Sequence, residues 1–106
     1  MAARLTSDFR VRALMAQAHS ADAFAALLFR GDAERGAILL KVRRSGALCL
    51  LRESATGPDG EQIWQPLPDR AEAEADALIA KRRRFDRDLW VVEIDDPASR
   101  FDIDQI

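Results

Sequence analysis

The segment Ala23-Phe-Ala-Ala-Leu-Leu-Phe-Arg30 is apolar at both alternating sets of positions. A strand with one face in water alternates apolar and polar residues, and this segment does not. The expected strands at Ala47–Glu53 and Leu89–Asp95 share the property. A sheet made of such strands needs cover on both faces. The sequence therefore predicts a small three-layer sandwich with one helix on each face of the sheet.

The first helix is expected over residues 7–20, with Ser7 as its N-cap and Asp8 in the favourable first turn. Its apolar residues recur at helical spacing and form one stripe. The stripe consists of Val11, Leu14, Met15 and Ala18.

The second helix is expected from a cap at Asp69, with Glu72 three residues later as in a capping box, to an end near Asp86. Acidic residues occupy its first turns and Lys81–Arg84 its last, an order that suits the helix dipole. Phe85 is expected to extend the inner stripe. That stripe is predicted to contain Ala71, Ala75, Leu78, Ile79 and Arg82.

The remaining strands are expected at Ala37–Arg43 and Glu61–Gln65, the latter ended by Pro66-Leu-Pro68. The polar fourth strand is interpreted as an edge. The order is then α-β-β-β-β-α-β, an α/β (α+β) fold with a mostly antiparallel sheet. The first four strands are expected to form a meander, with the fifth near the first, inside the sheet or at its far edge. An alternative places both helices on one face and buries the other face in a dimer.

Length and composition limit the classes of protein. The 106 residues suit a single domain, 1–106, in which 96–106 is a short C-terminal tail. A single cysteine, Cys49, excludes an internal disulfide, and no Cys/His cluster predicts structural zinc. The net charge of −2 does not favour nucleic acid as a partner, and no apolar run approaches the ~20 residues of a membrane span. A cytoplasmic location without membrane contact is therefore expected.

Charge is unevenly distributed along the chain. Residues 1–52 hold nine basic and four acidic residues, and residues 53–106 hold seven basic and fourteen acidic residues. The split is compatible with self-association of a dipolar molecule. The favoured interpretation is that the two halves interleave in one fold and their charges mix on its surface.

Two binding candidates stand out. Trp64, on the expected edge strand, is a plausible anchor for a partner protein. The one basic run consists of Lys81 and the three arginines Arg82, Arg83 and Arg84. It could bind a phosphate, although consecutive helical residues point in different directions. The ordinary interpretation of this run is a helix end matched to its dipole.

Other motifs have simpler structural explanations. Glu93 and Asp95 share one face of a strand and are weak metal candidates, but a solvated strand exit explains them as well. Arg30-Gly-Asp32 is interpreted as a turn. Cys49, among leucines, is expected to be inert packing, and a dyad with His19 is disfavoured.

Two stretches, Arg30-Gly-Asp-Ala-Glu-Arg-Gly-Ala-Ile-Leu-Leu-Lys-Val42 and Phe85-Asp-Arg-Asp-Leu-Trp-Val-Val-Glu-Ile-Asp95, join a Gly-Asp…Gly-Ala hairpin to an Asp-x-Asp-Leu-Trp strand entry. Over nearly its full length the chain resembles a bacterial family of about this size catalogued as a domain of unknown function, of the DUF1491 type. The resemblance implies a stand-alone α/β domain. It implies no activity, cofactor or catalytic residue.

Three functions compete. The first is a non-catalytic cytoplasmic interaction or regulatory module that binds itself or another protein, with no cofactor. The second is a divergent metal-dependent nuclease or nucleic-acid binder, although neither Lys41 nor Lys81 has the Glu or Gln two residues earlier that such enzymes use. The third is a small-molecule sensor with a pocket between sheet and helix.

Overall fold

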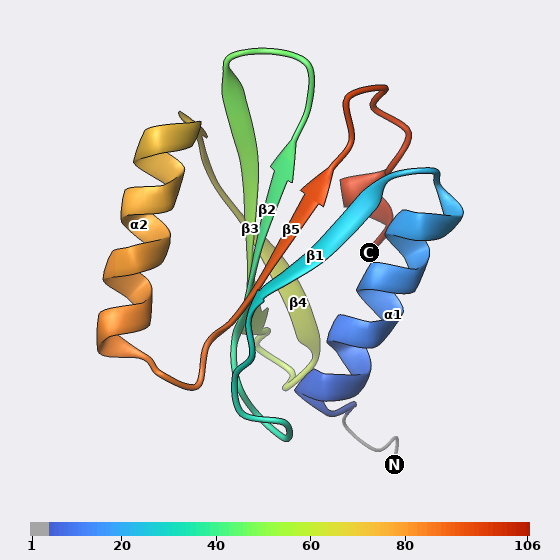
Figure 1. The fold of residues 1–106 in the computed structure, drawn as a ribbon. Helices are drawn as coiled ribbons and strands as arrows, with labels where there is room; N and C mark the ends of the chain where they lie inside the picture. Colours follow the sequence, from blue (N-terminus) through green and yellow to red (C-terminus); the bar gives the residue numbers. More distant parts are fainter. Residues whose placement is uncertain (1–4) are drawn as a thin grey trace.

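The computed structural model describes residues 5–106, so the first four residues of the expected 1–106 domain lie outside it. Two helices and a five-stranded sheet follow the expected order (Figure 1). The elements are α1 (Ser7–Ser20), β1 (Phe24–Phe29), β2 (Ile38–Arg43), β3 (Leu48–Thr56), β4 (Gln62–Ala71), α2 (Glu72–Phe85), β5 (Trp90–Asp95) and the short 3-10 helix η1 (Ile103–Gln105).

The sheet has the strand order β1-β5-β2-β3-β4. β5 is antiparallel to β1 and parallel to β2, and the β2-β3-β4 part is an antiparallel meander. The expectation of a four-strand meander was wrong, because β5 is inserted between β1 and β2. Pairing of the fifth strand with the first is confirmed, and of the two positions left open β5 occupies the interior one. A strand as apolar as β5 gains most where strands pair on both of its sides and helices cover both of its faces.

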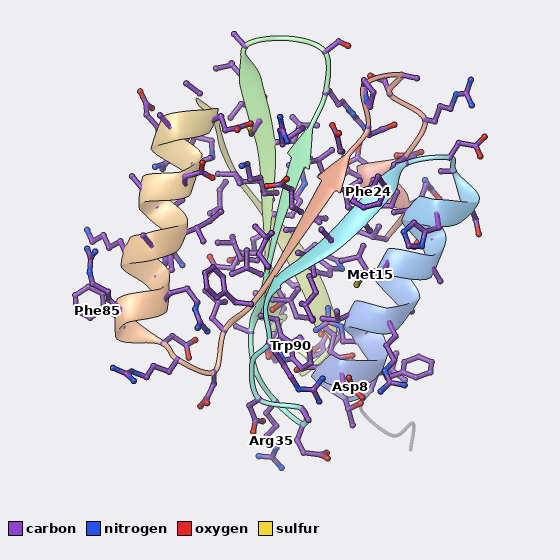
Figure 2. The ribbon with its side chains drawn as sticks, viewed as in Figure 1. Asp8, Met15, Phe24, Arg35, Phe85 and Trp90 are labelled. Atoms are coloured by element: carbon purple, nitrogen blue, oxygen red, sulfur yellow. The ribbon has the colours of Figure 1, made fainter. Side chains whose placement is uncertain are left out.

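α1 and α2 lie on opposite sides of the sheet, which gives three layers (Figure 1). Val11, Leu14 and Ala18 of α1 pack with Trp90 and Val92 in the larger core cluster. Figure 2 shows Trp90 and Met15 in this layer. On the other side, Ile79 of α2 packs on a smaller cluster. That cluster contains Leu39, Leu89 and Val91.

The N-cap of α1 lies one residue before the expected one. Thr6 is the N-cap, and its hydroxyl accepts from the backbone N–H of Phe9. Ser7 is instead buried, and its hydroxyl donates to the Gly36 carbonyl. The hydroxyl of Ser7 thus ties the start of α1 to the loop before β2.

β4 is longer than expected and runs through Pro66 and Pro68. The prediction that these prolines end the strand, and that Asp69 caps the next helix, was wrong. β4 is an edge strand, where a proline without an N–H is tolerated because that side of the strand needs no partner. The N-cap of α2 is Ala71, which makes no side-chain capping bond.

The inner face of α2 is shorter than expected. Ala75 and Ile79 are buried, but Phe85 is 82% exposed and points away from the sheet (Figure 2). The expectation that Phe85 extends the inner stripe was wrong. Arg82 occupies the inward position of the last turns, where it pairs with Glu53 of β3.

Residues 96–106, expected as a short tail, pack against the α1 side of the sheet. Phe101 and Ile103 belong to the larger core cluster. The buried carboxylate of Asp96 accepts from the backbone N–H groups of Arg100 and Phe101, and Arg44 donates to the Phe101 carbonyl at 2.6 Å. These bonds fix the path of the chain after β5.

The Arg30-Gly-Asp32 sequence lies in the connection from β1 to β2. The Asp32 carboxylate accepts from the backbone N–H groups of Glu34 and Arg35, as in an Asx turn. The Trp90 indole N–H donates to the Asp32 carbonyl at 2.7 Å. Gly31 lies against the Asp88 carbonyl and the Trp90 ring, with no room for a Cβ atom. This tripeptide is therefore a structural turn that seats Trp90.

Gly31→Ala should lower the free energy of unfolding by about 2 kcal/mol, because the added methyl group overpacks a contact between backbone and indole. Urea denaturation measures this loss. Gly60→Ala is the control, since space is open there and only the positive φ of 82° is strained, a cost of about 1 kcal/mol. Equal or reversed losses would contradict the packing explanation.

Candidate functional site

A groove lies between the edge strand β1 and helix α2. Its volume is about 540 Å³. Leu28 and Phe29 form one wall, and Ile79 and Ala80 form the facing wall. Asp76, Arg83, Arg84 and Arg87 complete the lining. The groove exists because α2 packs over β3 and β4 and leaves the β1 side of this face uncovered.

The helical wall follows directly from residue spacing. Positions 76, 79, 80, 83 and 84 recur at intervals of three and four, so they share one face of α2. Ala80 has a small side chain, which leaves space between α2 and β1. The charged residues lie at the ends of this face, with Asp76 at one end and the arginines at the other.

Arg83 is held in place at the arginine end. Its guanidinium donates to the carbonyls of Arg87 and Leu89 and lies 4.3 Å from the centre of the Phe29 ring. Such a cation–π contact joins α2 to the edge strand. Arg84 and Arg87 are exposed, and among residues 5–106 neither makes an ion pair.

Asp76, at the other end of the groove, belongs to an ionic network beneath α2. The Lys41 ammonium, on the central strand β2, is only 2% exposed and lies 2.8 Å from Asp76 and 3.1 Å from Glu93. Glu72 lies 3.9 Å from the same ammonium and 2.7 Å from the Arg43 guanidinium. Lys41 and Glu93 are direct partners in the parallel β2-β5 ladder. The network therefore ties α2 to the centre of the sheet.

This network contradicts one expectation drawn from the sequence. The strand expected at Leu89–Asp95 was interpreted as apolar on both faces, but the α2 side of β5 carries Glu93, which pairs with Lys41 and Arg43 of β2. A lysine within an otherwise apolar strand, Ile38-Leu-Leu-Lys-Val42, was the available signal. Its carboxylate partners come from α2 and β5, which are distant in sequence.

The pKa of Lys41 shows what this amine can do. Desolvation by burial lowers the pKa, but hydrogen bonds to Asp76 and Glu93 and the charges of both carboxylates raise it by more, so the net shift is upward. The amine is therefore protonated near neutral pH and cannot act as a nucleophile there. For the Cys49 thiol, burial itself raises the pKa and keeps the group in the unreactive protonated form.

The two edges of the sheet differ in chemistry. β4 carries Pro66, Pro68 and charged residues at its end. β1 has the sequence Phe-Ala-Ala-Leu-Leu-Phe, without a charge or a proline. Its large side chains are markedly exposed, from 39% for Leu27 to 68% for Phe24. Proline and charge are ordinary protections of an edge strand, and β1 has neither.

Two features bear on which backbone groups of β1 are free to pair with another strand. The ladder with β5 is irregular between Leu27 and Phe29. The backbone N–H of Ala25 donates to His19 Nε2 at 3.4 Å, so this donor points away from β5. In an antiparallel ladder successive residues point their backbone groups to alternate sides, so the groups of Leu27 point outward as well.

The residues proposed from sequence do not form one site. Trp64 is half-buried on the opposite edge, packed against the larger core cluster, with Arg10 5.2 Å from its ring centre. Arg82 pairs with Glu53, whereas Arg83 and Arg84 line the groove. Glu93 pairs with Lys41 and Arg43.

Asp95 is exposed at the end of β5, beside Arg43 in the ladder. Cys49 lies on the α2 side, and His19 bonds to β1 from α1, so the structure does not bring this pair together. Within residues 5–106, no group of three or more His, Cys, Asp or Glu side chains is placed to hold a metal ion. No helix in the same range is long and apolar enough to cross a membrane.

The comparisons agree with the fold and the motifs. The family model described as "Protein of unknown function (DUF1491)" matches residues 5–104. The chain belongs to this family. No curated protein compared with it matches.

Solved structures of relatives have the same fold. The crystal structure of a DUF1491 family protein from Caulobacter crescentus has a TM-score of 0.81 and 39% identity, covering 94% of this chain and 96% of that one. An NMR structure of a DUF1491 protein from the same organism gives 0.80 and 40%, covering 94% and 93%. The solution structure of Atu0922 from A. tumefaciens gives 0.77 and 32%, covering 88% and 86%.

Lys41→Met should lower the free energy of unfolding by about 2 kcal/mol, because it leaves Asp76 and Glu93 without their shared cation. The carboxylates are partly exposed, 56% for Asp76 and 21% for Glu93, which keeps the loss below that of a fully buried pair. Chemical denaturation measures the change. Lys81→Met, on an exposed lysine, is the control and should be nearly neutral. A wild-type stability in Lys41→Met would contradict a structural role for the network.

The same network predicts a dependence on alkaline pH. The folded-state pKa of Lys41 lies above the unfolded value of about 10.4, so its contribution is complete below that pH and is lost as pH rises through the folded value. The wild type should lose more stability than Lys41→Met as pH rises above about 10.4. Parallel pH-dependent melts of the two proteins would show this, and identical slopes would argue against it.

Proposed function

We propose that the protein is a non-catalytic cytoplasmic interaction module that associates with a second copy of itself through the open edge of β1. The observation that carries the proposal is the six-residue edge Phe24–Phe29, which is apolar and without charge or proline, and whose large side chains are exposed. An open strand edge pairs with another strand through its backbone, and its side chains set the register. Pairing two β1 strands would make one continuous sheet.

Charge supports an antiparallel register centred on Ala26. This register places Ala25 opposite Leu27 of the second copy, so that backbone groups pointing outward meet each other. It also places Asp22, just before β1, next to Arg30 of the second copy, just after it. Both side chains are exposed, at 76% and 62%, but each has a partner within its own chain: Asp22 lies 3.0 Å from Arg100, and Arg30 lies 4.0 Å from Asp8. The contact between copies would therefore exchange or share these surface ion pairs, which are worth little in water. Opposite charges at the two ends favour this register over its neighbours.

The hydrogen bond from the Ala25 N–H to His19 must break in this arrangement. The Ala25 N–H that now donates to His19 would donate to the second copy, and the imidazole would turn toward water. The loss is modest, because one weak hydrogen bond of 3.4 Å is exchanged for a backbone bond.

The alternative of a metal-dependent nuclease or nucleic-acid binder gains no observation in its favour among residues 5–106. Glu93 is engaged by Lys41 and Arg43. The protonated states of Lys41 and Cys49 also favour binding over covalent catalysis. We therefore place the docking surface on β1 rather than at Trp64.

Self-association is measured by sedimentation velocity over a wide range of protein concentration. The wild type should form dimers, and Leu27→Lys should shift the population to monomer, because it places a charge at the paired edge. The matched control is Leu48→Lys, which adds the same charge at an exposed leucine of β3, outside the β1 edge. Thermal melts check that both variants fold.

The register has its own test. Arg30→Glu should weaken the dimer by placing like charges together, and adding Asp22→Asn should restore part of the affinity. A wild type that stays monomeric at every concentration, or equal effects of Leu27→Lys and Leu48→Lys, would refute docking through β1.

A further inference from the structure

We propose that the groove between β1 and α2 binds a small amphiphilic anion, an unbranched apolar chain with one carboxylate or phosphate head group. Its two long walls are apolar, formed by Leu28 and Phe29 on one side and Ile79 and Ala80 on the other. The end of the groove near the C-terminus of α2 carries three arginines. This inference rests on the groove's side chains, whereas the proposed dimer rests on the backbone edge of β1.

The dimensions suit a small molecule. The volume of about 540 Å³ lies within the usual range of ligand pockets, about 300–1,000 Å³. Along α2, the distance from Asp76 to Arg84 is about 12 Å at the rise of a helix. A chain of that length can lie along the apolar walls with its head group at the arginines.

The charges fix the orientation of the ligand. Arg83 is held against Phe29 by its backbone bonds, and Arg84 and Arg87 are exposed beside it without an ion pair among the described residues. The nearby Asp86 turns its carboxylate onto the backbone N–H of Asp88. The arginine end is therefore a site for an anion.

The opposite end does not compete for the head group. Asp76 is the one acid among the described residues of the lining, and its carboxylate is 2.8 Å from the Lys41 ammonium. That ion pair neutralises the acid and closes the apolar trough. Asp76 therefore offers no positive charge to an anionic head, whereas the arginines do, so the head lies at the arginine end and the apolar tail points toward Asp76.

Binding is measured by isothermal titration of the full chain with decanoate and, separately, decyl phosphate, both below their micelle concentrations. At least one should bind, and the tighter of the two identifies the head group. Decyltrimethylammonium has the same tail with a cationic head and should bind far more weakly. Butyrate has the head without the tail and should also bind weakly. Amide chemical shifts should change at Phe29 and Ala80.

Two variants test the position. Arg84→Glu should raise the dissociation constant about tenfold or more, because it removes a charge-assisted contact and adds repulsion. Lys81→Glu is the matched control, since it makes the same charge change outside the groove. Ala80→Phe fills the space between the walls and should abolish binding, while a melting curve verifies the fold.

The outcomes are decisive in either direction. Failure of both decanoate and decyl phosphate to bind, equal binding of the cationic analogue, or equal effects of Arg84→Glu and Lys81→Glu would overturn the proposal. The dimer is judged separately, because Arg84→Glu should leave sedimentation unchanged and Leu27→Lys should leave the arginine end of the groove intact. A monomeric protein that still binds decanoate would refute only the dimer.

Discussion

The position of β5 between β1 and β2 determines the rest of the structure. Its residues Trp90, Val92 and Ile94 pack toward α1, and Val91 packs toward α2, so both of its faces must be covered. The parallel pairing with β2 requires a crossover, which α2 provides. The three-layer arrangement therefore follows from one strand, β5, which carries apolar side chains on both faces that must be buried.

The two layers on either side of the sheet are not equivalent. The α1 layer holds the larger apolar cluster, completed by Phe101 and Ile103 from the C-terminal segment. The α2 layer is divided between a small apolar cluster and the ionic network of Lys41. α2 packs over β3 and β4, is joined to β3 by the Arg82–Glu53 pair and leaves β1 open. The groove and the exposed edge are consequences of this off-centre position.

Local sequence signals were good predictors wherever a residue's partners are close in the chain. The stripe of α1, the glycine turns and the polar character of the β4 edge were all predicted correctly. Errors arose where a long-range partner decides the outcome. Pro66 lies within a strand because nothing pairs on the outer side of β4. Phe85, the last residue of α2, is exposed, and in the last turns the ion pair of Arg82 with Glu53 of β3 replaces the expected apolar contact.

The sequence alone determined the order of the elements, the presence of a sheet covered on both faces and the family resemblance, because these depend on residue type and spacing. Only the tertiary structure decided that β5 enters the sheet interior and that Lys41 meets Asp76 and Glu93. It also decided that β1, rather than the strand of Trp64, is the unprotected edge. The reason is that strand order, ion pairing and exposure are relations between segments far apart in the chain, and the periodicity of one segment carries no information about them.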